Sequence, residues 1–334
     1  MGSWLNYKTI LLLCIPLIFG LGREQETQKK WGFFGHKRIN RIATFTLPPE
    51  MFGFYKEHIE YLTEHAVDPD KRRYAVDGEA QRHYIDIDHY AEHGENPFDV
   101  VPVRWNDAVE KLTEDTLQAY GIVPWHIMVM KYRLQRAFEH KNVDLILKYS
   151  ADIGHYIGDA HVPLHTTENY NGQLTDQKGI HGLWESRLVE INYSHYDYFV
   201  GKAEHFSDLQ SHIWNSVTAS HLALDSVFQM EIDVTKDIGP DKKYSFEKRG
   251  NTTVSVYSYE FSQEYHRRMN GMVERRLKAA IYTTGSVWYT AWVDAGQPDL
   301  SELQNTPPSA ALLEEIKQMD EHFHNDKSKG RICE

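Results

Sequence analysis

An ordered series of metal-binding residue types constrains this chain of 334 residues more than any other feature. The series begins in the stretch Trp31-Gly-Phe-Phe-Gly-His36 and counts nine positions with Trp31 at its head. Its members are Trp31, His36, Asp68, His83, His155, Asp159, His165, His181 and Glu185. Imidazole and carboxylate groups without thiolates are typical ligands of zinc or a similar divalent metal. Because one site takes about four ligands, the series predicts a cluster of about three ions.

Two pairs in the series have helical spacing. Their members are four residues apart, and the pairs are His155 with Asp159 and His181 with Glu185. Residues four apart on a helix share a face, so both members of a pair point the same way. Gly154 and Gly158 each cost roughly 1 kcal/mol of helix propensity relative to Ala, but they permit close approach of a metal or another backbone. A solvated surface pair is the ordinary explanation of either pair alone, and the nearby His165 favours a binding site instead.

Other members of the series lie in polar segments that offer different explanations. Asp68 belongs to a charged run that a solvated turn would also explain. His83 precedes Asp86, Asp88 and His89, which are alternative ligands or partners that orient a ligating imidazole. Several histidines outside the series are expected to be structural or solvated, namely His221, His266, His322 and His324.

Hydrophobic periodicity predicts a single, mostly helical domain of the all-α class. Apolar residues recur at helical spacing in four segments, 105–120, 142–159, 213–228 and 261–281. No convincing period-two pattern competes with them, so no strand series is expected. Two long irregular segments, 66–103 and 164–182, carry proposed ligands. Metal binding would give these segments a reason to be ordered.

The N-terminus has the pattern of an export signal. Lys8 is followed by an apolar run over residues 9–21, which is short for a membrane span and typical of a signal peptide. We expect a signal peptide over 1–22, a spacer or pro-segment over 23–30, a catalytic domain over 31–299 and a peripheral tail over 300–334. The protein would then be exported, either secreted or periplasmic, and the alternative is an uncleaved membrane anchor.

Charge and cysteine content limit the remaining possibilities. The formal net charge of −12 is a poor match for a protein that binds nucleic acid by bulk electrostatics, although a local basic groove remains compatible with it. Removal of residues 1–22 leaves Cys333 as the single cysteine, so no intramolecular disulfide is possible. Bound metals can stabilise such a domain, because the free energy of metal binding adds to that of folding.

The ordered motifs resemble the superfamily of zinc-dependent phospholipases C and type I single-strand-preferring nucleases. They are Trp31-x4-His36, Asp68-x14-His83, His155-x3-Asp159-x5-His165 and His181-x3-Glu185. The resemblance implies a mostly helical domain with three zinc ions in a cleft. It implies one zinc at Asp68, His83, His155 and Asp159. A second would share Asp159 and bind His36 with the amine and carbonyl of Trp31. The third would bind His165, His181 and Glu185.

The resemblance also implies a mechanism. Two cations bridged by Asp159 would activate a shared water for attack on phosphorus, and Asp68 is a candidate base. The amine of Trp31 can bind zinc only if it is the free N-terminus, which requires cleavage directly after Lys30.

The substrate is less closely defined. Glu185 and the acidic net charge favour a phospholipase C-like phosphodiesterase, because the nucleases usually carry Asp at the position of Glu185. The alternative is a single-strand-preferring endonuclease and 3′-nucleotidase, and a minor alternative is a non-catalytic secreted zinc-binding protein. The expected partners are a phospholipid or a single-stranded nucleic acid or nucleotide, with transient contact to a membrane surface and no obligate protein partner.

Overall fold

The computed structural model describes residues 33–92, 94–249, 252–327 and 329, and helices make up most of this part of the chain. The helices are α1 (Phe33–Ala43), α2 (Pro49–Glu57), α3 (Ile59–Glu64), α4 (Asp68–Arg72), α5 (Pro97–Val100), α6 (Trp105–Leu112), α7 (Glu114–Tyr120), α8 (Val123–Glu139), α9 (Val143–Ala160), α10 (Leu188–Asn192), α11 (Leu209–His221), α12 (Leu224–Ile238), α13 (Tyr259–Arg268), α14 (Met272–Asp294) and α15 (Ala310–Asn325). The two strands are β1 (Tyr244–Arg249) and β2 (Thr252–Tyr257). The prediction of an all-α domain is therefore confirmed.

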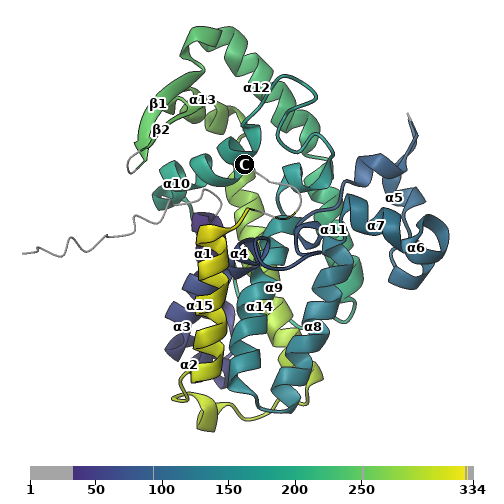
Figure 1. The fold of residues 1–334 in the computed structure, drawn as a ribbon, viewed down its shortest axis with the longest axis vertical. Helices are drawn as coiled ribbons and strands as arrows, with labels where there is room; N and C mark the ends of the chain where they lie inside the picture. The colour runs from purple at the N-terminus through teal and green to yellow at the C-terminus, as the bar shows by residue number, and fades with distance from the viewer. Residues whose placement is uncertain (1–32, 93, 250–251, 328, 330–334) are drawn as a thin grey trace, which may run out of the picture.

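Helix α9 lies inside the molecule, with α1, α8 and α14 packed around it (Figure 1). It begins where the side chain of Asn142 accepts a hydrogen bond from the backbone N–H of Leu145, which satisfies a donor of the first turn. Its second half is buried on every side, from Ser150 to Ala160. The side chains of His155 and Asp159 on this half are therefore held by a rigid, fully packed element.

The two glycines of α9 let α1 come very close. A Cβ atom at Gly154 would lie 1.9 Å from Oδ1 of Asn40, and one at Gly158 would lie 2.7 Å from Nδ1 of His36. Asn40 also donates to the backbone carbonyl of Ala151 in α9, at 3.0 Å. The close approach that these glycines predicted is thus made by side chains of α1, and it brings His36 against the end of α9 that carries Asp159.

Three helices expected to be continuous are interrupted. Thr113 has φ 67° between α6 and α7, and its side chain caps α7 by accepting from Thr116 N–H. Asn270 and Gly271 have φ 47° and 73° between α13 and α14. Helices α11 and α12 are separated at Leu222 and Ala223. The two helices on either side of each break pack their apolar faces against the same core. The apolar pattern in the sequence therefore continues through the break and does not reveal it.

Strands β1 and β2 form an antiparallel hairpin in which Tyr244 pairs with Tyr257. The hairpin was not expected from the sequence. Strand β2 is rich in Thr and Val, which favour the extended backbone, and burial alternates from residue 253 to 257, but a single run of six residues is a weak signal beside the helical segments. The hairpin lies with α12 and α13 at the upper end of Figure 1.

The C-terminal segment ends in α15, which lies on the outside of the bundle and contacts α4. Asp320 pairs with Lys71 of α4 at 2.8 Å, and the ring of Phe323 packs edge-on against Tyr74. Leu312 and Met319 are buried. The tail that was expected to be peripheral thus packs on the outer side of α4. None of the helices in the described ranges combines the length and the apolar character that crossing a membrane requires.

Candidate metal centre

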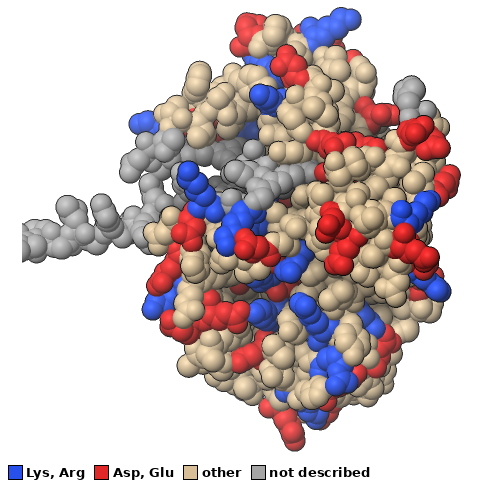
Figure 2. All heavy atoms as spheres, turned by 45° about the vertical axis from the view of Figure 1, so that its right-hand side comes forward, with Lys and Arg blue, Asp and Glu red and all other residues tan. Residues whose placement is uncertain are grey.

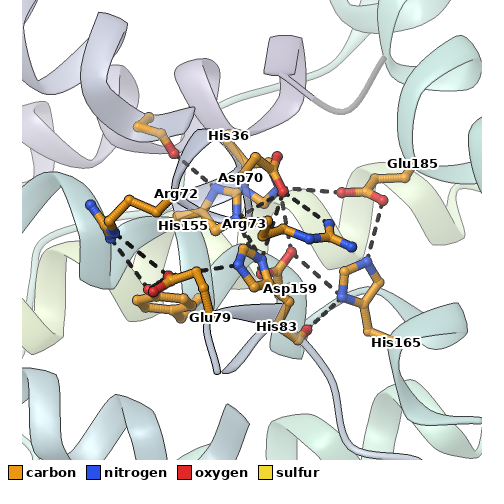
Figure 3. A network of polar contacts seen from close by, with 12 residues as sticks. His36, Asp70, Arg72, Arg73, Glu79, His83, His155, Asp159, His165 and Glu185 are labelled. Carbon is orange, nitrogen blue, oxygen red and sulfur yellow. Dashed lines mark hydrogen bonds and ion pairs between the residues drawn. The ribbon is translucent and has the colours of Figure 1, made fainter. Parts of the chain in front are cut away.

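Side chains from separate elements converge beside the C-terminal half of α9 (Figure 3). Helix α9 supplies His155 and Asp159, α1 supplies His36, and α4 supplies Asp70. The others come from short turns and from a π-helix (Gly182–Arg187), and they are His83, His165, His181 and Glu185. The π-helix is a rare conformation that recurs at functional sites.

Asp159 lies at the centre of this arrangement. Its Oδ2 is 3.0 Å from Nδ1 of His83 and 3.3 Å from Nε2 of His155. Its Oδ1 is 3.5 Å from Nε2 of His36 and 3.5 Å from Nδ1 of His165. Oδ2 thus faces His83 and His155, whereas Oδ1 faces His36, so the two oxygens lie toward different imidazoles, as in a carboxylate that two cations would share.

A second cluster of possible metal ligands consists of His165, His181 and Glu185. Oε2 of Glu185 is 2.6 Å from Nε2 of His181 and 3.4 Å from Nε2 of His165. The other oxygen, Oε1, lies 3.2 Å from Nε2 of His36. Glu185 therefore connects this group to the residues around Asp159.

Three groups of these residues have ligand atoms close enough to hold one ion each. They are His36 with His155 and Asp159, then Asp70 with His83 and His155, and finally His165 with His181 and Glu185. The atoms of each group lie within 4.8 Å of one another. Imidazole nitrogens and carboxylate oxygens, without sulfur, are a donor set that fits zinc.

Asp70, rather than Asp68, faces the imidazoles. Oδ1 of Asp70 lies 3.7 Å from Nδ1 of His83 and 3.8 Å from Nε2 of His155. Asp68 instead contacts Nδ1 of His65 at 2.8 Å and Nζ of Lys71 at 3.2 Å. Side chains two positions apart on a helix point in nearly opposite directions, so the first turn of α4 presents one of the two aspartates to the cluster. Asp68 thus belongs to none of the three groups, whereas Asp70, which the sequence did not single out, belongs to one of them; that Asp68 is a ligand stays a prediction.

The remaining candidates from the sequence are Trp31 and the polar residues that follow His83. Trp31 lies outside the described residues. Asp86, Asp88 and His89 belong to none of the three groups. Asp88 accepts hydrogen bonds from the hydroxyl of Thr167 and the backbone N–H of Glu168, which ties the segment after His83 to the segment after His165.

Three of the imidazoles are oriented by backbone carbonyls. Nδ1 of His155 lies 2.9 Å from the carbonyl of Ala66, Nδ1 of His165 lies 2.6 Å from that of His83, and Nδ1 of His181 lies 3.1 Å from that of Tyr170. A carbonyl oxygen can only accept, so each Nδ1 carries the proton and each Nε2 keeps its lone pair. Such partners fix the tautomer and the ring orientation of metal-binding histidines.

Burial sets the charge state of the site. It lowers the pKa of His83 and His155 well below the usual value, and neighbouring imidazoles lower both further. Burial also lowers the pKa of His165. Burial alone would raise the pKa of Glu185, but His165 and hydrogen bonds from three imidazoles hold it well below its usual value. Neutral imidazole and ionised carboxylate are the forms that bind metal.

A small pocket that is partly open to solvent adjoins these residues. His36 and Glu185 form its wall on the side of the cluster, while Trp184 and Leu277 contribute apolar surface. Arg276 also lines this pocket. Arg73 lies instead beside Asp70, with its guanidinium 3.4 Å from Oδ1 of that residue (Figure 3). A pocket that combines a cation with apolar walls suits an anionic organic substrate.

The sequence was compared with known families and proteins. Comparison with curated proteins gave no match. The family model described as S1/P1 Nuclease matches residues 31–283, which is most of the chain and includes every residue of the three groups. Members of this family are zinc-dependent phosphoric diester hydrolases and belong to the superfamily that the sequence motifs indicated. The chain belongs to the S1/P1 nuclease family.

Proposed function

We propose that this protein is a zinc-dependent nuclease that hydrolyses phosphodiester bonds in single-stranded nucleic acid. The observation that carries the proposal is the position of Asp159, whose two oxygens face different imidazoles. The family match supports the nuclease alternative better than the phospholipase C-like activity that the sequence favoured.

The proposed ligands are the members of the three groups, of which His155 occurs in two. Asp159 would be shared between two ions, because it faces His83 as well as the group of His36 and His155. Bound zinc would lower the pKa of water and neutralise charge on the phosphate. His155, His165 and His181 direct lone pairs of fixed orientation inward, because backbone carbonyls hold their Nδ1 protons. The site is therefore preorganised by the protein before any substrate binds.

Asp70 is the proposed proton acceptor. Its Oδ1 faces the imidazoles of His83 and His155 but is partly exposed, so a water at the edge of the cluster can reach it. The proton of the attacking water would move to this oxygen, and the guanidinium of Arg73 would hold a phosphate oxygen beside it. Asp68, the base that the sequence suggested, pairs with Lys71 at 3.2 Å and is the alternative proton acceptor.

The surface charge is compatible with short-range recognition of the substrate. On the face shown in Figure 2, basic and acidic side chains are interspersed, and no broad field of one sign covers it. With a net charge of −12, affinity for nucleic acid would come from the metals, Arg73 and local contacts.

Parallel assays test this function. Zinc-loaded protein that starts at Trp31 would be incubated with single-stranded DNA, RNA, 3′-mononucleotides and phosphatidylcholine, with Asp159→Asn as the background control. We expect zinc-dependent cleavage of the nucleic acids. Hydrolysis of phosphatidylcholine alone would establish the phospholipase C-like alternative, which Glu185 still favours. Zinc binding without turnover of any substrate would establish the non-catalytic alternative.

We also propose that the protein is exported through residues 1–22, which lie outside the described residues. Secretion is typical of the S1/P1 nucleases. A membrane anchor formed by the uncleaved segment is the alternative. N-terminal sequencing of the protein from the culture medium and from the membrane fraction distinguishes the two.

A further inference from the structure

His83 differs from the other imidazoles of the cluster in the nitrogen that it turns inward. Its Nδ1 lies 3.0 Å from Nε2 of His155 and 3.0 Å from Oδ2 of Asp159. His155, His165 and His181 turn Nε2 inward and bond Nδ1 to a backbone carbonyl. Nε2 of His83 is buried and makes no hydrogen bond.

The nearest carboxylate to this outer nitrogen belongs to Glu79. Its Oε1 lies 3.9 Å from Nε2 of His83, and its side chain is completely buried (Figure 3). The two residues are four apart in the sequence, like the two pairs in the metal-binding series. Glu79 belongs to none of the three metal groups, so it is available as a partner of the ring.

Charged and polar neighbours keep Glu79 in place. The hydroxyl of Tyr156 donates to Oε1, Arg82 donates to Oε2, and Nε of Arg72 lies 3.6 Å from Oε1. Arg72 is itself paired with Asp152 at 2.9 Å. An ionised carboxylate is tolerated in the interior only when it is paired in this way. The network thus holds a negative charge behind His83.

We infer that Glu79 is a positioning residue for the metal centre, and that it accepts the Nε2 proton of His83 while Nδ1 binds zinc. The gap of 3.9 Å exceeds a hydrogen bond, and a small rotation of the ring would close it. A carboxylate in this place fixes the tautomer and increases the basicity of the ligating nitrogen. The inference rests on the assignment of His83 as a ligand under the proposed function.

The rival explanation is that Glu79 only neutralises Arg72 and Arg82 and stabilises the fold. The two explanations differ in what removal of the charge would change. A structural role would lower the thermal stability of the metal-free protein and leave its affinity for zinc unaltered. A positioning role lowers the affinity itself, by about 10- to 100-fold for a partner of a metal-binding histidine.

The test measures zinc affinity by competition with a chromophoric chelator, together with the melting temperature of the metal-free protein. Glu79→Gln is expected to weaken the affinity for zinc by about 10- to 100-fold. Glu79→Asp keeps the charge that the two arginines need, so it folds even where Glu79→Gln does not. Because the shorter Asp side chain moves the carboxylate away from His83, Glu79→Asp should also weaken the affinity for zinc, but less than Glu79→Gln does.

Glu231→Gln is the matched control. Glu231 in α12 is also buried, accepts the hydroxyl of Tyr257 at 3.0 Å and pairs with Lys243 at 2.6 Å, but it belongs to none of the metal groups. We expect Glu231→Gln to change stability and not zinc affinity. Wild-type affinity in every Glu79 variant that folds would overturn the inference, and so would an equal loss in Glu231→Gln.

His83→Ala separates this inference from the proposed function. If His83→Ala loses zinc while the Glu79 variants do not, His83 is a ligand and only the positioning role is wrong. If His83→Ala keeps the zinc content and affinity of the wild type, the assignment of the metal centre is wrong, and the inference falls with it.

Discussion

Asp159, on the last turn of α9, lies 3.0 Å from Nδ1 of His83, which follows a short turn far earlier in the chain. The same carboxylate reaches His36 of α1 through its other oxygen. One side chain therefore joins three parts of the fold, and its loss should disturb more than a single ion.

We predict that Asp159→Asn lowers both zinc content and turnover more than His181→Ala does. The amide cannot supply two anionic oxygens, and Asp159 faces His36, His83 and His155, whereas His181 belongs to the group of His165 and Glu185. The loss of activity should exceed the factor of about 100 that is the upper range for an outer partner of a metal ligand. The melting temperature should also fall, because metal binding is linked to folding. Elemental analysis, kinetics on single-stranded DNA and calorimetry measure these effects. Equal losses in the two variants would contradict a shared ligand.

Asp70 and Asp68 offer a matched pair of substitutions. Asp70→Asn should reduce turnover by at least about 100-fold, because it removes a general base as well as a carboxylate beside two imidazoles. Asp68→Asn should keep most activity and lower stability, since Asp68 contacts His65 and Lys71. Both variants are assayed at saturating zinc. If Asp68→Asn is the inactive one, the spacing between Asp68 and His83 was the better guide.

The helical pairs show why part of the site could be predicted from the sequence. Residues four apart on a helix share a face regardless of what surrounds them, and α9 does present His155 and Asp159 together. No such rule applies to the segment before His83. The choice between Asp68 and Asp70 depends on where α4 begins and how it packs on α9, which is a tertiary property.

The fold, like the site, could be predicted where local sequence pattern decides the structure and could not where tertiary packing does. Apolar periodicity predicted the helices because each buries one face, and it located α9 to within about a residue. It could not detect the break at Asn270 and Gly271, because the flanking helices α13 and α14 continue the apolar pattern. Glu79 was overlooked although it is four residues from His83, because a buried glutamate in an irregular segment has no periodic signature.

Helix α15 should contribute measurably to stability. Leu312 is buried, so Leu312→Ala is expected to lower the free energy of unfolding by about 2 kcal/mol or more. Leu313, its neighbour in the sequence, is exposed, and Leu313→Ala should change that free energy by less than about 0.5 kcal/mol. Chemical denaturation of the zinc-loaded protein measures both values. Equal effects would mean that α15 does not dock as described.

His126 should make stability depend on pH. Its imidazole in α8 is buried, and burial, reinforced by the positive charges of Arg82, Arg133 and Arg72, lowers its pKa well below the usual value. The unfolded chain takes up this proton near pH 6.5, whereas the folded protein does so only at lower pH. The stability due to the neutral ring is therefore complete above about pH 6.5 and declines as the pH falls, by at most about 1.4 kcal/mol per pH unit.

His126→Phe provides the comparison for this effect. It keeps an aromatic ring beside Tyr156 but cannot titrate, so its stability should decline less steeply between about pH 6.5 and 5. Metal ligands titrate equally in both proteins, and the difference between the two stability curves isolates His126. Parallel curves would show that folding leaves the pKa of His126 unchanged.

The N-terminus provides the last prediction. If Trp31 supplies its amine to the ion near His36, cleavage directly after Lys30 is required, because an amide nitrogen at the same place is a poor zinc ligand. Protein that starts at Trp31 should then bind more zinc and turn over faster than protein that starts at Gln28. A variant that starts at Trp31 but carries an acetylated amine is the matched control, since it changes the donor and nothing else. Mass spectrometry would verify each N-terminus before metal content and activity are measured. Full zinc content and full activity in the protein that starts at Gln28 would remove the amine of Trp31 from the ligands and leave the roles of His36, Asp159 and Glu185 unchanged.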